Sequence, residues 1–96
     1  MKITYDTTKD ASNKEKHGLS LQDAAYLDWR SVMVMPDDRR DYGELREVGY
    51  GLIGDRLHCV VFVMRENELR VISFRKANRR EIIRYVSRLQ NSIADS

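Results

Sequence analysis

Cationic side chains concentrate where a predicted strand leads into the last predicted helix. Arg70 and Arg75 belong to the strand segment, and Lys76, Arg79 and Arg80 follow at the start of the helix. Cations are electrostatically unfavourable at that end of a helix, because it already carries the positive pole of the helix dipole. Free backbone amides and arginine side chains together make a phosphate site. The segment therefore predicts an anion-binding surface, and phosphates are the expected ligands.

The strand within this surface is expected to present two unlike faces. Side chains alternate along a strand, so the expected faces are Val71, Ser73 and Arg75 on one side and Arg70, Ile72 and Phe74 on the other. One of the two arginines must then share a face with large apolar groups or lie beyond the edge of the core. Arg84 and Arg88 continue from Arg80 at four-residue spacing, either as a solvated helix face or as part of the anion-binding surface.

Two histidines could take part in acid–base chemistry. His17 follows Lys16 at the end of the first predicted helix, where it either complements the helix dipole or acts as a general acid or base. His58 falls within a strand and is expected to pack or to lie on the surface. With one cysteine, Cys59, the histidines form no metal-ligand cluster, and no phosphate-binding glycine loop or nucleophile elbow occurs. We therefore expect neither a metal nor a cofactor, and the acidic loop of Asp37, Asp38 and Asp41 does not change this.

Length and composition predict one small soluble domain spanning residues 1–96. The chain is 42% hydrophobic, which is ordinary for a globular protein. The longest apolar run, residues 59–64, is far shorter than the roughly 20 residues needed to cross a bilayer. No secretory leader is recognisable, and the single cysteine suits a buried, reduced thiol. A cytoplasmic location without membrane contact is expected.

Charge is unevenly distributed along the chain. Residues 1–64 carry nine basic and eleven acidic side chains, a balance of −2, and residues 65–96 carry eight and four, a balance of +4. This asymmetry favours a localised anionic partner over a generally basic surface.

The hydrophobic pattern predicts an α+β fold with an antiparallel sheet of four or five strands, two N-terminal helices and a C-terminal helix. Strands are expected at residues 2–5, 31–35, 44–53, 56–65 and 69–75, with Gly54-Asp55 as a hairpin turn and 60–63 buried at the centre of the sheet. The first helix should begin at Asp6 or Thr7 and end before Gly18, and Ser20 with Asp23 resembles a capping box for the second. Asn78 and Glu81 form another such pattern, before an apolar stripe of Ile82, Val86, Leu89 and Ile93. The helices are expected to pack against the sheet.

Several blocks of the sequence, taken in order, resemble the BrnT toxins. The most specific are Lys16-His17-Gly18 after the first helix and Ile72-Ser73-Phe74-Arg75-Lys76-Ala77 before the last. The other matches are Tyr5-Asp6, Lys9, Asn13, Ala24-Ala25, Asp38-Arg39, Gly43-Glu44, Arg46, Gly51, Arg79-Arg80-Glu81 and Tyr85. The resemblance spans roughly residues 3–90. Two positions depart from the family pattern, since Tyr5 stands where Trp is frequent and Arg40 where His is common.

The resemblance implies a type II toxin with a RelE-like fold, a metal-independent endoribonuclease that cleaves RNA and blocks translation. Carried onto the matching positions, it nominates as catalytic residues Lys16, His17, Glu44, Arg46 and Arg75. The residues expected to bind the phosphates of the RNA substrate are Arg70, Lys76, Arg79 and Arg80.

The resemblance also implies a protein partner, a BrnA-like antitoxin with a ribbon-helix-helix part. Promoter DNA would be contacted only through the complex with that antitoxin. Two other functions stay open, namely a non-catalytic co-repressor that binds the antitoxin and a general nucleic-acid-binding module. RNA sequence preference, ribosome dependence, the assignment of acid and base and the stoichiometry of the complex do not follow from the sequence.

Overall fold

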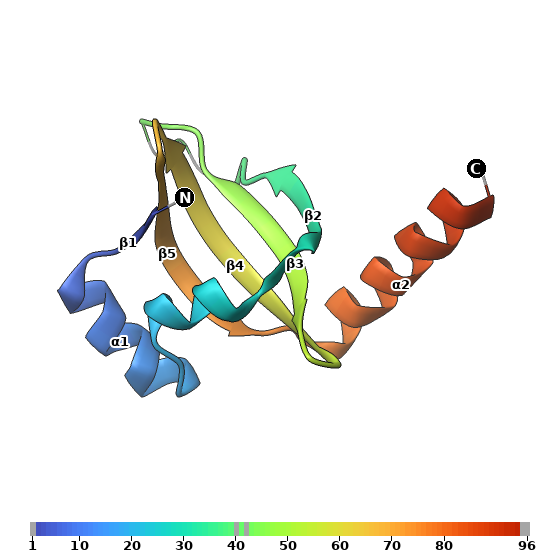
Figure 1. The fold of residues 1–96 in the computed structure, drawn as a ribbon, viewed down its shortest axis with the longest axis horizontal. Coiled ribbons are helices and arrows are strands. Elements are labelled where there is room, and N and C mark those ends of the chain that lie inside the picture. Colours follow the sequence, from blue (N-terminus) through green and yellow to red (C-terminus); the bar gives the residue numbers. More distant parts are fainter. Residues whose placement is uncertain (1, 40, 42, 95–96) are drawn as a thin grey trace.

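A five-stranded sheet forms the centre of the molecule (Figure 1). The computed structural model describes residues 2–39, 41 and 43–94. The spatial order of the strands is β1 (Lys2–Thr4), β5 (Glu68–Lys76), β4 (Arg56–Arg65), β3 (Glu47–Ile53) and β2 (Asp28–Pro36). The run predicted to be central is confirmed, since β4 lies in the middle of the sheet and is buried from Leu57 to Val63.

The sheet is mixed, so the prediction of an antiparallel sheet is wrong at one edge. β1 pairs with β5 in parallel, whereas the other three pairings are antiparallel. A parallel pair needs a long connection, because the chain must return to the same end of the sheet. Here β1 is the first strand and β5 the last, so everything from residue 5 to residue 67 connects them.

The helices begin and end largely where the capping patterns predict. In α1 (Thr7–His17), the Asp6 side chain accepts hydrogen bonds from the amides of Thr8 and Lys9, and Gly18 ends the helix at φ 72°. The Ser20–Asp23 capping box is also present. It starts a six-residue 3-10 helix, η1 (Leu21–Tyr26), because the chain turns at Leu27 directly into β2. The second N-terminal helix is therefore a 3-10 turn structure and not an α-helix.

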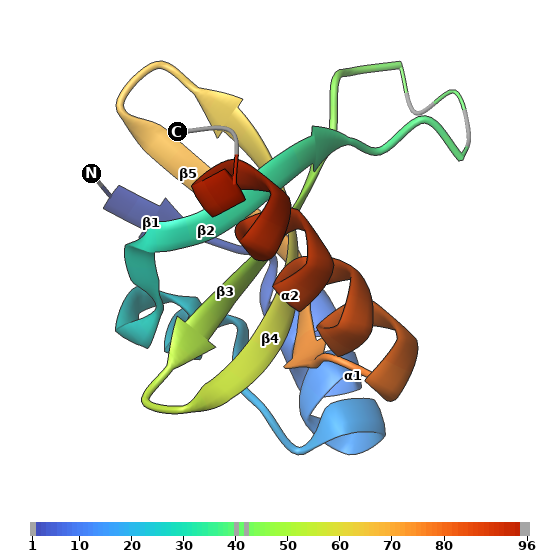
Figure 2. The ribbon, with the colours of Figure 1, turned by 90° about the vertical axis from the view of Figure 1, so that its right-hand side faces the viewer.

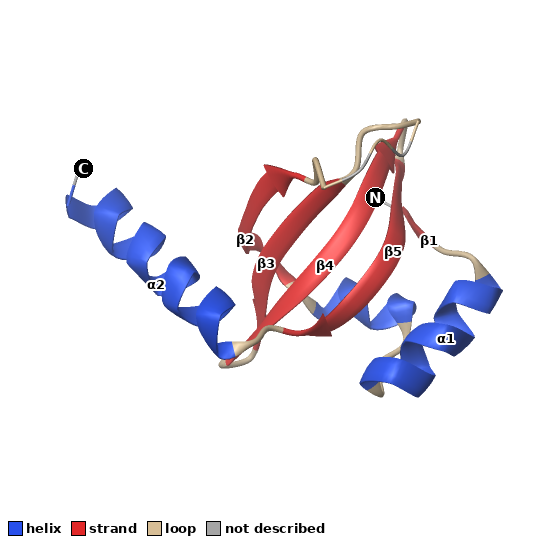
Figure 3. Ribbon diagram, turned by 180° about the vertical axis from the view of Figure 1, so that it is seen from behind, coloured by secondary structure: helices blue, strands red, loops and turns tan. Residues whose placement is uncertain are grey.

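The apolar core lies between one face of the sheet and the two N-terminal helices. Figure 1 and Figure 3, seen from opposite sides, show α1 and η1 on the same face. The buried cluster there consists of Leu21, Ala24, Leu27, Val60, Phe62, Leu69, Val71 and Phe74. Trp29 meets the Phe62 ring edge-on, with centroids 5.7 Å apart. His58 stacks on Phe74 at 5.2 Å, which confirms that it packs in the interior.

A bulge in β5 changes which of its side chains share a face. The pairs on either side of it are Val61 with Ser73 and Phe62 with Val71. Ile72 is therefore an extra residue, and an extra residue reverses the alternation beyond it. Val71 and Phe74 both belong to the core cluster as a result. The predicted division of this strand into strictly alternating faces is wrong here.

The same bulge brings the two arginines of β5 to one face of the sheet. Arg70 pairs with Val63 and Arg75 pairs with Cys59, two positions of β4 that are four residues apart. Directly paired residues point to the same side, and β4 alternates regularly against β3. Arg70 and Arg75 therefore both lie opposite the core, where neither has to share space with the apolar cluster.

The C-terminal helix, α2 (Arg79–Ala94), extends away from the sheet (Figure 1). Its apolar stripe is partly open to solvent, with Val86 and Leu89 each 44% exposed and Ile93 67% exposed. The expectation that this helix packs its apolar side on the sheet is wrong. Polar bonds hold it instead: the Tyr85 hydroxyl donates to the carbonyl of Ser31 at 2.8 Å, and Glu81 binds the sheet.

A buried asparagine joins α1 to β5. Its Nδ2 donates to the carbonyls of Phe74 at 2.7 Å and Leu19 at 2.8 Å, and its Oδ1 accepts from the Phe74 amide at 3.1 Å. The residue, Asn13, is 5% exposed. It satisfies both backbone groups of Phe74 next to the bulge, so it sets how α1 lies against the strand that carries Arg75.

We expect Asn13→Ala to lower the free energy of unfolding by about 2–3 kcal/mol, because backbone groups of Phe74 lose their partner in a buried place. Urea denaturation measures this loss. The control is Asn91→Ala on the exposed side of α2, which should change stability by less than about 0.5 kcal/mol. Equal effects of the two substitutions would contradict the role given to Asn13.

Candidate active site

A polar cavity of about 310 Å³ opens on the face of the sheet opposite the core. Its floor comes from alternate residues of three strands, namely Val48, Tyr50, Cys59, Val61, Ser73 and Arg75. Its walls are the end of β2 with the loop that follows it and the first turns of α2. The charged groups of these walls come from Asp37, Asp38, Arg39, Glu81 and Arg84. Three guanidinium groups therefore surround one small cavity.

Arg75 is held by a two-point ion pair with Glu81. Nη1 of Arg75 lies 2.7 Å from Oε1 of Glu81, and Nη2 lies 2.8 Å from Oε2. Nη1 also donates to the carbonyl of Lys76 at 3.3 Å. Paired parallel bonds of this kind fix the plane of the guanidinium as well as its position.

This arrangement leaves Arg75 able to bind an anion. A guanidinium has five N–H donors, and the bonds to Glu81 and Lys76 use three of them. In the described part of the chain, the Nε–H and one Nη2 hydrogen are left over. The side chain is one-third exposed, so these donors can reach a ligand in the cavity. A fixed cation with two N–H groups to spare is suited to a phosphate oxygen.

Glu81 is a structural anion and is unsuited to proton transfer. Besides the two bonds from Arg75, its carboxylate accepts from the Asn78 amide at 2.9 Å and from the Tyr50 hydroxyl at 3.1 Å. Its amide in turn donates to Oδ1 of Asn78, which confirms the predicted capping box. The Arg75 guanidinium is the main reason that the pKa of Glu81 is lowered to about 2.

Tyr50 and Cys59, which also line the floor, are neutral around pH 7. Burial is the main reason that the pKa of Tyr50 is raised to about 12, so its hydroxyl keeps the proton that it donates to Glu81. Burial also raises the pKa of the Cys59 thiol. Cys59 is 3% exposed, as predicted for a buried thiol, and it is no candidate nucleophile.

A second ion pair closes the opposite wall of the cavity. The Asp37 carboxylate, 1% exposed, binds Arg39 through Nε at 2.7 Å and Nη2 at 2.8 Å. The Arg39 side chain is 69% exposed and presents its charge at the rim. Among the described residues, no group of three His, Cys, Asp or Glu side chains could hold a metal ion. Among the acids of this loop, Asp37 thus holds an arginine.

Three nominated cations share the face of the cavity. Arg70 and Arg75 do so through the bulge in β5. Arg46 directly precedes β3, and alternation places it on the side of Val48 and Tyr50. The carbonyl of Arg46 accepts from the Asp37 amide at 2.8 Å, so Arg46 is tied to the wall that carries Arg39.

The other three nominated catalytic residues, including both candidates for acid and base, lie elsewhere. Lys16 and His17 end α1, which lies on the core face, and both are exposed. Glu44 forms an ion pair with Arg65 at 2.9 Å, near the opposite end of β4 from Cys59. Six residues of strand separate Arg65 from Cys59, a span of roughly 20 Å. In the described part of the chain, no hydrogen bond or ion pair joins these three residues to Arg75.

The remaining nominated cations surround the start of α2. Lys76, Arg79 and Arg80 are all exposed, at the end of β5 and in the first turn of the helix. They lie beside the cavity without lining it. Arg40, which stands where the family commonly has His, lies outside the described residues.

Sequence reasoning missed Tyr50, Asp37 and Arg39 as parts of the site. Tyr50 reads as an ordinary strand residue, and only strand pairing places it beside Cys59. Glu81 was recognised as a cap residue, but not as the partner of Arg75. The sequence signal that could have indicated the role of Glu81 is its position as an acid among cations at the start of a helix. The signal that could have indicated the ion pair of Asp37 and Arg39 is the spacing of an acid and an arginine two positions apart.

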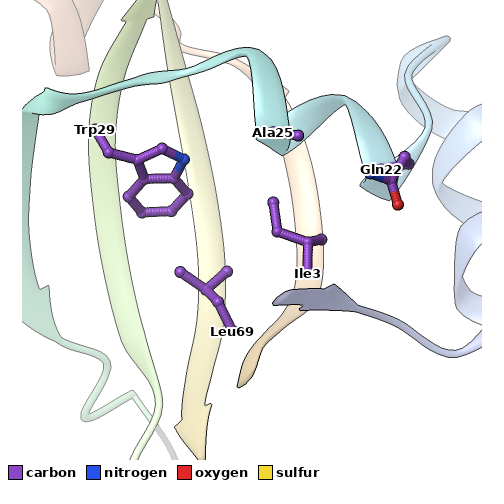
Figure 4. A pocket seen from close by; sticks show the side chains of 5 residues that line it. All are labelled: Ile3, Gln22, Ala25, Trp29 and Leu69. Atoms are coloured by element: carbon purple, nitrogen blue, oxygen red, sulfur yellow. The ribbon is translucent and has the colours of Figure 1, made fainter. Parts of the chain in front are cut away.

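A different cavity, of about 460 Å³, opens at the edge of the core face (Figure 4). It is lined by Ile3, Gln22, Ala25, Trp29 and Leu69, with no charged side chain among them. The Trp29 indole already donates to the carbonyl of Ala24 at 3.2 Å. This lining has no charged group that could bind an anion, so the polar cavity around Arg75 is the better candidate for chemistry.

Comparison with known proteins identifies a family. A family model described as "Ribonuclease toxin, BrnT, of type II toxin-antitoxin system" matches residues 5–81. The matched part includes α1, the strands β2 to β5 and the Arg75–Glu81 pair, and it ends in the first turn of α2. No curated protein matches the chain. None of the helices in the described part of the chain has the length and apolar character needed to span a membrane.

The carboxylate of Glu81, which accepts four hydrogen bonds, predicts that the stability of the protein depends on pH. Because the pKa of Glu81 falls from 4.5 to about 2 on folding, its contribution is complete above pH 4.5 and is lost as the pH drops toward 2. The loss should be on the order of 3 kcal/mol in the free energy of unfolding. Glu81→Gln should be less stable at pH 7 and lack this acid-dependent part.

Urea denaturation at several pH values between 7 and about 2 measures the effect. The control is Glu15→Gln, because Glu15 is an exposed residue of α1. It should keep the wild-type profile. An unchanged profile in Glu81→Gln would show that the ion pair does not couple to folding.

Proposed function

The chain belongs to the BrnT family of ribonuclease toxins of type II toxin–antitoxin systems, and we propose that it is a metal-independent endoribonuclease that blocks translation. The proposal includes one domain, residues 1–96, with a RelE-like fold, acting in the cytoplasm. The observation that carries it is the fixed Arg75 guanidinium, with two N–H donors left over in a polar cavity that two further arginines line.

RNA cleavage through a cyclic phosphate needs few specialised groups. A base activates the 2′-hydroxyl, an acid protonates the leaving oxygen, and cations stabilise the charge that develops on the phosphorus-bound oxygens. In the proposal Arg75 and Arg46 supply that charge stabilisation. Arg70, Lys76, Arg79 and Arg80 bind neighbouring phosphates of the strand. Guanidinium groups can do this without help from a metal ion.

A BrnA-like ribbon-helix-helix antitoxin is the proposed protein partner. The family to which the chain belongs implies an antitoxin, and an acidic segment of it could cover Arg75 and the exposed cations at the start of α2. Repressor activity at the promoter would then belong to the complex, with the antitoxin making the DNA contacts.

One observation favours a second function, a non-catalytic co-repressor that binds the antitoxin. His17 and Glu44 are the candidates for acid and base, and they lie away from Arg75, as does Lys16. The two functions differ in what expression does to a cell. A co-repressor binds its antitoxin tightly but leaves growth and RNA unaffected, whereas the ribonuclease arrests growth.

Arg75→Ala should relieve growth arrest after induced expression and lower RNA cleavage by about 100-fold or more, because one stabiliser of the developing charge is lost. Purified wild type should degrade RNA equally well in EDTA. Arg75→Lys keeps the charge without the two-point bond, so it should recover only part of the activity.

The control is Arg30→Ala, since Arg30 is a 94% exposed arginine of β2 outside the cavity, and it should stay toxic. Thermal unfolding of every variant separates loss of chemistry from loss of the fold. Harmless wild-type expression, together with intact RNA both with and without divalent metal, would end the ribonuclease proposal and leave the co-repressor.

A further inference from the structure

A groove adjoins the Arg75 cavity, between α2 and the strands β2 and β3. It has a volume of about 230 Å³ and is lined chiefly by Met33, Met35, Tyr50, Tyr85, Arg84 and Arg88. Figure 2 looks onto this side of the molecule, with α2 in front of β2. The groove therefore has an apolar and aromatic lining, with guanidinium groups from one side of α2.

The groove and the Arg75 cavity are continuous. Met35, Tyr50, Glu81 and Arg84 line both of them. Met33 and Arg88 line only the groove, and Arg75 lines only the cavity. A ligand with its phosphate at Arg75 would thus meet the groove directly next to that phosphate.

Hydrogen bonds from two tyrosine hydroxyls hold the walls of the groove in place. Tyr85 donates to the carbonyl of Ser31 at 2.8 Å, and Tyr50 donates to Glu81 at 3.1 Å. These bonds fix α2 at two successive turns against β2 and β3. The acid of the lining, Glu81, has all its bonds to protein groups, so the unsatisfied charge in the groove is positive.

The lining selects among possible occupants. A docked helix anchors through residues i, i+3, i+4 and i+7, over about two turns, and a groove of about 230 Å³ is too small to take these anchors. A flat aromatic ring suits both the apolar and the cationic part of the lining. Methionine and tyrosine provide apolar contact, and the planes of arginine side chains stack on rings. Single-stranded RNA presents such rings beside phosphates.

From these contacts we propose that the groove is a nucleobase subsite, which binds the base next to the phosphate held at Arg75. The proposal rests on the proposed function, because it takes an RNA strand as the ligand of Arg75. It assigns Arg84 and Arg88 to substrate binding. It also gives Met33 a role on the substrate side of β2, where an apolar residue has no other evident purpose.

The test uses a ligand that cannot be cleaved, so that binding is measured separately from catalysis. A short fluorescent single-stranded 2′-deoxyoligonucleotide lacks the attacking hydroxyl. It is compared by fluorescence anisotropy with a strand of the same length in which abasic sugars replace the bases. Wild type should bind the base-containing strand about tenfold or more tightly, as expected for base stacking.

Met33→Ser should remove most of this preference while leaving the affinity for the base-free strand unchanged. Met33→Leu keeps the apolar volume and should behave as wild type. Arg88→Ala should weaken binding of the base-containing strand, and Lys2→Ala, at the opposite edge of the sheet, should not. Thermal unfolding confirms that each variant is folded.

Each outcome of these binding measurements either supports or overturns the nucleobase subsite. Equal affinity for the two strands in wild type, or an equal loss for both strands in Met33→Ser, overturns the subsite. Binding of neither strand overturns the subsite, and the cleavage assay with wild type and Arg75→Ala then decides separately whether RNA is the substrate. A base preference that depends on Met33 supports the subsite even where the protein leaves RNA uncleaved, and in that case only the catalytic part of the proposed function fails.

Discussion

The carboxylate of Glu81 connects the parts of this molecule that its apolar core does not reach. It accepts four hydrogen bonds, two from Arg75 on β5, one from Tyr50 on β3 and one from the amide of Asn78 at the start of α2. Charge-assisted bonds of this kind are stronger than neutral ones, and a 7% exposed carboxylate without them would be costly. The position of α2 and the orientation of Arg75 therefore depend on the same anion. A cation that is already oriented needs little rearrangement when a phosphate arrives.

The second constraint is the extra residue in β5. Without Ile72 as a bulge, strict alternation would place Arg70 on the face of the apolar cluster, where a charge has no partner. With it, the strand gives Val71 and Phe74 to the core and both arginines to the other face. Asn13 binds the backbone of Phe74 just beyond the bulge, so α1 stabilises the irregular part of the strand.

The two faces of the sheet thus have different chemistry. One is covered by α1 and η1 and is almost wholly apolar. The other carries the Arg75 cavity, the Asp37–Arg39 pair and the groove beside α2. Arg84 and Arg88 belong to the groove side of α2, and Val86 is turned away from both of them at 100° per residue. Four of the eight basic residues in 65–96 therefore lie on this second face, namely Arg70, Arg75, Arg84 and Arg88.

The sequence by itself determined those features that depend on near neighbours in the chain. Asp6 and Gly18 bound α1, Asn78 and Glu81 start α2, and residues 60–63 mark the central strand, because caps and burial patterns are local. The family was recognisable too, since its motifs are short and ordered, and Arg75 stood out through its neighbours in the basic segment.

Only the tertiary structure decided which residues meet. The parallel pairing of β1 with β5, the bulge at Ile72 and the open stripe of α2 depend on contacts between distant segments, and no local pattern encodes them. The same is true of the site, because strand pairing puts Tyr50 and Cys59 beside Arg75, and chain return puts Asp37 and Arg39 across from it. The tertiary structure also separates His17 and Glu44 from Arg75. Spacing along the chain limits what neighbours can do, but strand register and the return of the chain decide which charges face one another.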